Sequence, residues 1–539
     1  MPRGGLHLAE GGGVTSSPYG AVGLAQLGAV ALGGALTAYG LPSPGLWVFA
    51  WFGLVPLIVA ANAAPTVCRA ALCGFAAGFA YHAVAAHWIY ATCRFAQVPA
   101  VVSALAVVAL AAVLGAGWAA VAALARLASE SAPRGARPLV WAAAWTAVAS
   151  FEALWTPRVG MDLLAYTQWS NLALLQAGSW GGPHLLDFTL VLFNAALAGV
   201  WRDERDDADI PALAAAFLLA AGAWAHGAAV LAARPESRGP VGRVEILQPR
   251  VDQYHKWSET WLSEILAGYD ELLSRPRPAA PLLVVWPETS IPRWTDRAEP
   301  VPEAARWAVK LGAQNLVGII ASPANASGAE SGPANAVQLI APDGRLDGRY
   351  AKRQLVPFGE FVPLRRFVPR FVIDRWLMIL DNLGDLEAGA ARQPLLQTAW
   401  GPTAVTICYE AIFPRWPRLD AARGARLMIN ITNDAWYLDT WGPRQHYRIN
   451  RFRAIENRLT VIRSGNNGIS AVIDPWGVTT AELALNERGR LDAEVPLQDA
   501  FPGRSFYTRH GDWLGASCLV FVLLAVLAVI LKDSLVSPI

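Results

Sequence analysis

The apolar residues of this chain form long runs over its first 233 residues and one further run near its end. A helix needs about 20 apolar residues to cross the hydrocarbon core of a bilayer, so these runs predict membrane spans. Within residues 1–233, six more runs follow the first one, which favours an uncleaved helix over a secretory signal. The eight predicted spans lie at about 20–40, 46–62, 71–90, 98–125, 138–156, 180–201, 211–233 and 513–531.

The chain between the last two spans, from about residue 241 to residue 505, is patterned differently. Short apolar runs typical of buried strands alternate there with stretches of helical spacing, which predicts a layered α/β domain. The expected strands lie at about 244–247, 282–286, 315–321, 336–341, 404–408, 427–431, 459–463 and 468–474. The expected helices lie at about 256–273, 302–313, 411–422 and 443–457.

Basic residues in the predicted loops indicate the orientation of the chain. If the N-terminus is cytoplasmic, the short outer loops hold only Arg94 and Arg158, as the positive-inside rule requires. We therefore expect a seven-helix membrane domain over 1–235, an α/β domain on the outer, periplasmic face over 236–508, and a final helix with a cytoplasmic tail over 509–539. One miscounted span would reverse the face of the large domain. The expected cytoplasmic set is Arg3, Arg69, Arg126, Arg134, Arg137, Arg202, Arg205 and Lys532.

The composition agrees with a protein that is partly embedded in a membrane. Of the 539 residues, 54% are hydrophobic and 16% are charged, against about 25% charged in an ordinary soluble domain. The net charge of +2 and the lack of basic runs argue against a nucleic-acid partner. The five cysteines have the spacing of neither a disulfide framework nor a metal site, so we expect no metal and no cofactor. Only Cys408 lies in the polar half of the chain.

Three short segments each place an ionisable residue directly after an apolar strand or a stiff turn, and these residues are Glu288, Lys352 and Cys408. Strand ends that share one sheet edge are where α/β folds place their sites. A thiolate is a nucleophile, a nearby carboxylate can accept the thiol proton, and an ammonium can stabilise an oxyanion. The three residue types are therefore suited to covalent catalysis, provided that they meet in space.

Each of the three residues also has an ordinary structural interpretation. Glu288 fits a solvated residue at a strand exit, Lys352 fits one of several exposed charges, and Cys408 fits an inert core thiol. Taken singly, such interpretations are the commoner ones. Pro287 fixes the turn before Glu288 and favours a functional interpretation at that position.

Longer strings around these residues narrow the choice. In combination they resemble the bacterial apolipoprotein N-acyltransferases, a family within the nitrilase (carbon–nitrogen hydrolase) superfamily. The resemblance covers roughly residues 240–480, and the eight-span layout is also similar to that family. The matching strings are Pro287-Glu288, Lys352, LVPFGEFVP at 355–363, Cys408-Tyr409-Glu410, TNDAWY at 432–437 followed by Gly442-Pro443 and Gln445-His446, RFRAIEN at 451–457 and RSGNNGIS at 463–470.

The resemblance implies a membrane protein with an eight-helix bundle and a nitrilase-like αββα sandwich. It implies that Glu288 is the general base, Lys352 the oxyanion stabiliser and Cys408 the nucleophile. It further implies an auxiliary carboxylate, Glu360, near the lysine. The remaining implied site neighbours or substrate-binding residues are Tyr409, Glu410, Asn433 and Trp436.

Members of this family take an acyl chain from a phospholipid, typically phosphatidylethanolamine, onto the cysteine. They pass it to the amine of diacylglyceryl-cysteine at the N-terminus of a lipoprotein. We therefore expect a ping-pong acyltransferase of the inner membrane that completes lipoprotein maturation. The alternatives are a membrane-tethered amidase that delivers the thioester to water, and a non-enzymatic membrane scaffold.

Some segments depart from the family pattern or allow two interpretations. Residues 361–380 mix apolar residues with arginines, which is typical either of an arm at the membrane surface or of an ordinary surface helix. Residues 151–182 follow the family only loosely, and Tyr437 stands where phenylalanine is common. Residues 381–389 also differ, which leaves the acyl length and the headgroup open.

Overall fold

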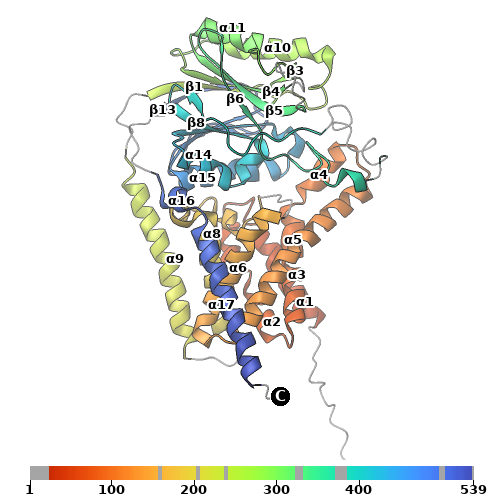
Figure 1. Ribbon diagram of the computed structural model, residues 1–539, viewed down its shortest axis with the longest axis vertical. Helices are drawn as coiled ribbons and strands as arrows, with labels where there is room; N and C mark the ends of the chain where they lie inside the picture. The colour runs from red at the N-terminus through yellow and green to blue at the C-terminus, as the bar shows by residue number, and fades with distance from the viewer. Residues whose placement is uncertain are drawn as a thin grey trace, which may run out of the picture.

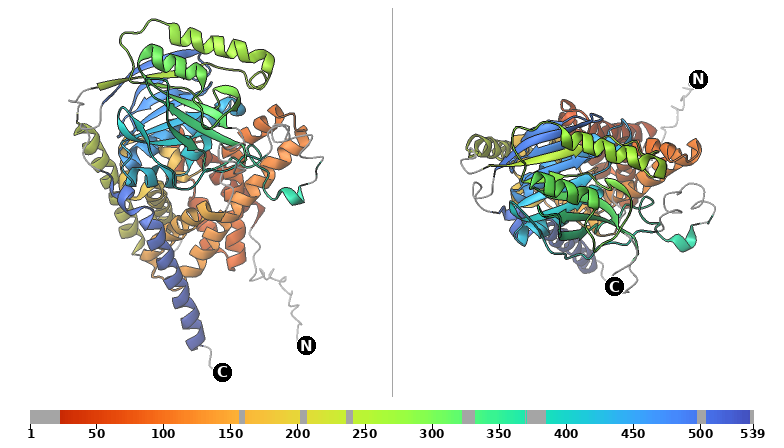
Figure 2. Two further views of the ribbon diagram at one scale, coloured as in Figure 1. Left: turned by 45° about the horizontal axis from the view of Figure 1, so that its top comes forward. Right: turned by 90° about the horizontal axis from the view of Figure 1, so that it is seen from above.

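The structure is a computed structural model that describes residues 23–155, 161–201, 207–235, 241–321, 332–368, 370, 385–496 and 504–536. It consists of a helical bundle, to which both ends of the chain contribute, and an α/β domain stacked on one end of that bundle (Figure 1). Seen from above, the α/β domain lies over the bundle (Figure 2). Four arginines used above to orient the chain, Arg3, Arg158, Arg202 and Arg205, lie outside the described residues.

Within the described residues, six helical segments are long and apolar enough to cross a membrane. They coincide with six of the eight predicted spans. The other two predicted spans, at 20–40 and 138–156, correspond to α1 (Leu24–Ala38), which has 15 residues, and to α6 (Arg137–Trp155), which is helical but is not among the six. The six segments are η1 with α2 (Leu46–Ala63), α3 (Val67–Ala85), α5 (Ala100–Ala128), α8 (Gly178–Val200), α9 (Asp209–Ala232) and the part Trp513–Lys532 of α17 (Trp513–Val536).

Close packing of α3 on α5 depends on glycine. A Cβ atom on Gly74 would lie 2.3 Å from the Trp118 carbonyl oxygen, and one on Gly78 would lie 2.7 Å from the Trp118 side chain. Small residues allow membrane helices to approach closely enough for van der Waals contact, since lipid offers no hydrophobic drive for association. The buried His82 pairs with Asp162 at 3.2 Å, which agrees with a structural role for that histidine.

The α/β domain consists of two β-sheets packed face to face, which confirms the predicted sandwich. Valine, leucine and isoleucine side chains from both sheets form one buried cluster between them. The first sheet has the order β13-β1-β2-β4-β5-β6, with β3 paired to β4, and the second has the order β12-β11-β10-β9-β8-β7. The strands are β1 (Val241–Gln248), β2 (Leu283–Val285), β3 (Ile291–Thr295), β4 (Gln314–Ala321), β5 (Ala334–Ile340), β6 (Leu346–Ala351), β7 (Leu396–Thr398), β8 (Gly401–Ile407), β9 (Leu427–Thr432), β10 (Thr460–Gly465), β11 (Ser470–Ile473), β12 (Thr479–Leu483) and β13 (Gly489–Pro496).

Helices cover both outer faces of the sandwich. The distal face carries α10 (Glu259–Ser274) and α11 (Pro302–Leu311), and the face toward the bundle carries α14 (Arg415–Ala422) and α15 (Gly442–Asn457) (Figure 1). The predicted helix at 411–422 was wrong at its start, because residues 408–412 form a short 3₁₀ turn, η5, before α14 begins. The strands predicted at about 459–463 and 468–474 are confirmed as β10 and β11, which pair antiparallel.

Two contacts fasten the α/β domain to α4 (Trp88–Phe95), a short helix that follows α3. Thr92 Oγ1 donates a hydrogen bond to the Trp436 carbonyl oxygen at 3.0 Å, and Tyr254 Oη donates one to the Phe95 carbonyl oxygen at 2.9 Å. The Tyr254 ring also packs on the Phe95 ring, with centroids 4.3 Å apart. Two separate loops of the α/β domain therefore rest on one helix of the bundle.

Replacing Gly74 by alanine should destabilise the bundle, because the new methyl group would meet backbone atoms that cannot move aside. Overpacking of this kind costs about 1–3 kcal/mol. We expect a lower midpoint of thermal unfolding for the purified protein. Gly28→Ala on α1 is the matched control, since a Cβ atom there meets nothing within 4 Å. Equal midpoints for the two variants would contradict the packing argument.

Candidate active site

Cys408 stands at a sharp bend directly after β8. Its φ angle is +50°, a left-handed conformation that is uncommon for a residue with a side chain. The Cys408 carbonyl oxygen lies 3.0 Å from His446 Nε2, and the other ring nitrogen of His446 lies 2.9 Å from the carboxylate of Asp434. Both groups are fully buried. His446 of α15 therefore holds the backbone of the bend through the Cys408 carbonyl oxygen. Backbone strain of this kind is typical of functional sites.

Asp434 holds His446 in position through its carboxylate group. Burial alone would raise the pKa of its carboxyl group, but the positive charge of Arg463 and the interaction with His446 lower it to about 2. Arg463 donates to Asp434 Oδ2 at 2.6 Å, and Thr432 donates to Oδ1 at 2.9 Å. The carboxylate is thus ionised and fully paired at neutral pH.

Glu288 follows β2 on the neighbouring sheet and is buried. Its Oε1 accepts hydrogen bonds from Asn335 Nδ2 at 2.7 Å and from Lys352 Nζ at 3.3 Å. Its Oε2 accepts one from the Asn433 backbone N–H at 2.8 Å. The next residue, Thr289, has a φ angle of +47°, so this turn is also held in a left-handed conformation.

Lys352 lies directly after β6 and is only 1% exposed. Its ammonium donates to Glu360 Oε1 at 2.8 Å as well as to Glu288. Burial by itself would lower the pKa of Lys352, but Glu360 and Glu288 raise it above its ordinary value. Glu360 also accepts a hydrogen bond from the Val356 N–H at 2.8 Å. Lys352 is therefore a permanent cation shared by two carboxylates.

Cys408 lies near this charged cluster. Burial raises the pKa of Cys408, and the negative charge of Glu288 raises it further, while Lys352 opposes both. Glu288, Lys352 and Cys408 are all buried, and the first two lie near enough to Cys408 to act on it electrostatically. A thiol in such surroundings stays protonated until a base removes its proton.

Two of the remaining predicted residues support the cysteine bend. Glu410 is fully buried and accepts hydrogen bonds from the N–H of Ile407 at 2.7 Å and from Tyr350 Oη at 2.8 Å. Glu410 therefore connects the backbone before Cys408 to Tyr350 of β6. The ring of Tyr409, which is buried, packs edge-on against Phe413 with centroids 5.1 Å apart.

Asn433 and Trp436 link the site to its surroundings. Asn433 donates its N–H to Glu288, and its side-chain amide donates to Gln253 Oε1 at 2.6 Å. Trp436, three residues later, is only partly buried, and its ring lies 6.1 Å from that of Phe95 on α4. The segment from Asn433 to Trp436 thus contacts both Glu288 and helix α4 of the bundle.

Two buried polar residues of this site, Asn335 and Lys256, were not predicted from the sequence. Asn335 bridges the two carboxylates through hydrogen bonds of 2.7 and 2.8 Å. Lys256 donates from Nζ to the Glu288 carbonyl oxygen at 3.1 Å and is 3% exposed. One available signal was the order of elements, because Lys256 follows β1 and Glu288 follows β2, and these two strands are parallel neighbours.

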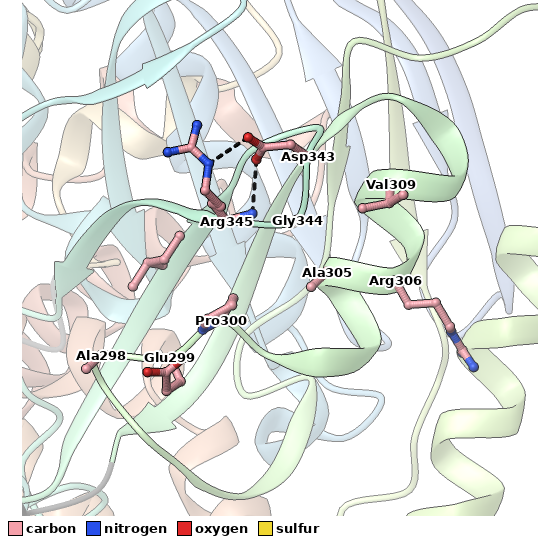
Figure 3. Close-up of a pocket in the computed structure, with 10 residues that line it drawn as sticks. Ala298, Glu299, Pro300, Ala305, Arg306, Val309, Asp343, Gly344 and Arg345 are labelled. Atoms are coloured by element: carbon pink, nitrogen blue, oxygen red, sulfur yellow. Dashed lines mark hydrogen bonds and ion pairs between the residues drawn. The ribbon is translucent and has the colours of Figure 1, made fainter.

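A surface hollow of about 720 Å³ lies elsewhere, between α11 and the turn before β6 (Figure 3). Figure 3 shows Asp343 and Arg345 there, and their side chains pair with each other at 2.6 Å. None of the site residues described above lines this hollow.

Comparison with known proteins matches both parts of the chain. Residues 244–504 match the carbon–nitrogen hydrolase family, and residues 33–196 match the apolipoprotein N-acyltransferase N-terminal domain. The apolipoprotein N-acyltransferase of Geobacter metallireducens is 32% identical over 500 residues, which are 90% of this chain and 92% of that protein. The one from Azotobacter vinelandii is 34% identical over 497 residues, or 89% and 90% of the two chains.

This chain belongs to the apolipoprotein N-acyltransferase family. It is an N-acyltransferase with a nitrilase-superfamily domain, which confirms the predicted function and leaves the amidase and scaffold alternatives without support. Among solved structures, the Caenorhabditis elegans NitFhit protein is similar at 21% identity and a TM-score of 0.36, covering 49% of this chain and 62% of that one. Nit3 of Saccharomyces cerevisiae is similar at 18% identity and a TM-score of 0.35, covering 48% and 91%.

Replacing Asp434 by asparagine should lower the free energy of unfolding by about 3–5 kcal/mol, because buried Arg463 would lose its counter-ion. The folded pKa of Asp434 is depressed, so its contribution is present above the ordinary aspartate pKa near ~3.9 and is lost as pH falls toward 2. Unfolding measured from pH 7 to pH 3 should show a smaller loss of stability in the variant than in the wild type.

Asp343→Asn is the matched control for this experiment. Asp343 pairs with Arg345 at the surface, where ion pairs contribute little. A loss of stability in Asp343→Asn as large as that in Asp434→Asn would contradict the assignment of Asp434 as the buried anchor.

Proposed function

We propose that this enzyme transfers an acyl chain from a phospholipid to the N-terminal amine of diacylglyceryl-cysteine in a lipoprotein, through a thioester on Cys408. Phosphatidylethanolamine is the proposed donor. The proposal rests on one buried site. In it, Lys352 pairs with Glu288 and Glu360, and the Cys408 thiol lies near Glu288 and Lys352. A thiol beside a carboxylate base and a fixed cation is suited to covalent acyl transfer.

In the first half-reaction, Glu288 takes the proton from Cys408 Sγ and the thiolate attacks the ester carbonyl carbon of the phospholipid. A C–S bond forms, and the carbonyl oxygen becomes an oxyanion that the Lys352 ammonium stabilises. The ester C–O bond then breaks. The proton on Glu288 passes to the departing alkoxide, and a lysophospholipid leaves.

In the second half-reaction, the neutral amine of the acceptor attacks the thioester carbonyl carbon. A C–N bond forms, the amine gives a proton to Glu288, and the C–S bond breaks to release the thiolate. That thiolate recovers the proton from Glu288, so the site returns to its starting state. Glu360 keeps Lys352 aimed at the reacting carbonyl, and it takes no proton in this scheme.

Water must be kept from the thioester, since hydrolysis would waste the acyl chain. Glu288, Lys352 and Cys408 are each less than 9% exposed. Low water access favours transfer to an amine over hydrolysis. Both substrates are lipids, so we propose that they reach the site from the membrane on its outer face. We also propose that the chain has eight spans and the domain bounds predicted from the sequence.

We also propose that residues 361–368, the described start of the segment predicted as an arm over 361–380, lie at the membrane surface. The described part of this segment exposes Leu364 at 71% and Phe367 at 68%, beside Arg365 and Arg366. Exposed apolar side chains next to arginines suit a surface where acyl chains meet phosphates. Residues 371–380 lie outside the described residues, and so does Arg375, which belonged to the predicted pattern.

Incubating the purified enzyme with phosphatidylethanolamine in the absence of acceptor should produce an acyl adduct on Cys408, because the second half-reaction cannot proceed. Intact-mass analysis should show the added acyl mass in the wild type and none in Cys408→Ala. Cys93→Ala is the control, since Cys93 is the partly exposed thiol of α4. An adduct that persists in Cys408→Ala, or is absent from the wild type, would contradict the thioester.

The proposed orientation is tested by labelling with a membrane-impermeant maleimide. In spheroplasts, a cysteine replacing Asp343 should be labelled, because this side chain is half exposed on the distal side of the α/β domain. Cys68, which is exposed at the start of α3, should be labelled only after the membrane is permeabilised. The reverse pattern would place the domain in the cytoplasm.

A further inference from the structure

Lys256 is a second buried cation at the active site. It lies in the segment between β1 and α10, and its ammonium donates to the carbonyl oxygen of Glu288 at 3.1 Å. Within the part of the chain that the structure describes, no carboxylate forms an ion pair with it, whereas Lys352 pairs with two. Burial without a paired carboxylate lowers the pKa of Lys256 to about 8, although the charges of Glu288 and Cys408 act against this shift.

The charges of the site do not balance without Lys256. Glu288 and Glu360 carry two negative charges, and Lys352 between them carries one positive charge. Formation of the oxyanion keeps this excess of one negative charge in the same buried volume, because Glu288 is neutralised by the thiol proton while the carbonyl oxygen becomes negative. An uncompensated charge is costly in such surroundings, so a second cation is required. Behind the Cys408 bend, Asp434 is paired with Arg463 and His446, so that cluster supplies no free positive charge.

We propose that Lys256 is a positioning residue of the acyl transfer reaction, which holds the backbone of Glu288 and supplies the second positive charge beside Cys408. It acts through Glu288 and Cys408 and needs no contact with substrate. The proposal rests on the functions proposed above for these two residues. The effect of Lys256 on the thiolate is electrostatic, since its ammonium favours the form of Cys408 that has lost its proton.

A purely structural role for Lys256 predicts something different. If the side chain only ties its loop to Glu288, a neutral hydrogen-bond donor of similar length should replace it. Lys256→Gln keeps a donor for the Glu288 carbonyl oxygen and removes the charge. Lys256→Arg keeps the charge, and an arginine does not lose its proton near pH 8.

The test measures alkylation of Cys408 by iodoacetamide against pH, with the full-length enzyme in lipid nanodiscs and the modified peptide quantified by mass spectrometry. Removing a positive charge raises the pKa of a thiol, so Lys256→Gln should move the alkylation profile upward by about one pH unit, or roughly tenfold in rate at a fixed pH. Below pH 8, where wild-type Lys256 keeps its charge, Lys256→Arg should stay close to the wild type. Lys310→Gln on α11 is the matched control, because this lysine lies over the Trp307 ring on the distal face.

A second measurement uses the formation of the acyl adduct from phosphatidylethanolamine. In the wild type, the rate should fall as pH rises through about 8, because Lys256 then loses its charge. In Lys256→Arg this loss should move to higher pH, which tests the proposal even if Lys256→Gln fails to fold. Alkylation and adduct profiles of both variants that coincide with those of the wild type would overturn it. Absence of the adduct from the wild type would instead overturn the proposed function itself.

Discussion

The ammonium of Lys352 is the interaction on which the rest of the site depends. It lies between the carboxylates of Glu288 and Glu360, and both carboxylates are largely buried, so water can do little to replace it. Burial of three charges is tolerated because each carboxylate oxygen has a hydrogen-bond partner, including Asn335 and the backbone of Asn433. The cysteine can therefore lie beside a base and a cation whose positions are already fixed before substrate arrives.

Two further networks hold the reacting residues in strained conformations. Glu410 binds the backbone before the Cys408 bend, and the Asp434–His446 pair binds the carbonyl oxygen of Cys408 itself. The α/β sandwich supplies these partners from different elements, since Glu410 follows β8, Asp434 follows β9 and His446 lies on α15. The bend persists because it is held on both sides, and its conformational cost is met by packing elsewhere in the domain.

Sequence patterns predicted much of this architecture, because apolar runs of two lengths distinguish membrane helices from buried strands. They could not show that Glu288, Lys352 and Cys408 meet, since proximity depends on how the two sheets face each other. Glu410 was expected as a site neighbour, and its contacts show why a carboxylate is buried there. Lys256 was missed because a single lysine in a loop is usually solvated, and only the parallel pairing of β1 with β2 brings it under Glu288.

The bundle is built from both ends of the chain, and this has a consequence for synthesis. The helix α17 packs on α5 and α6, and Trp513 donates to the Trp180 carbonyl oxygen on α8 at 3.0 Å. A ribosome makes α17 only after the whole sandwich has been translated. The sandwich can therefore begin to fold while the bundle still lacks α17, and the packing of α17 on α5, α6 and α8 joins the bundle after the sandwich has been made.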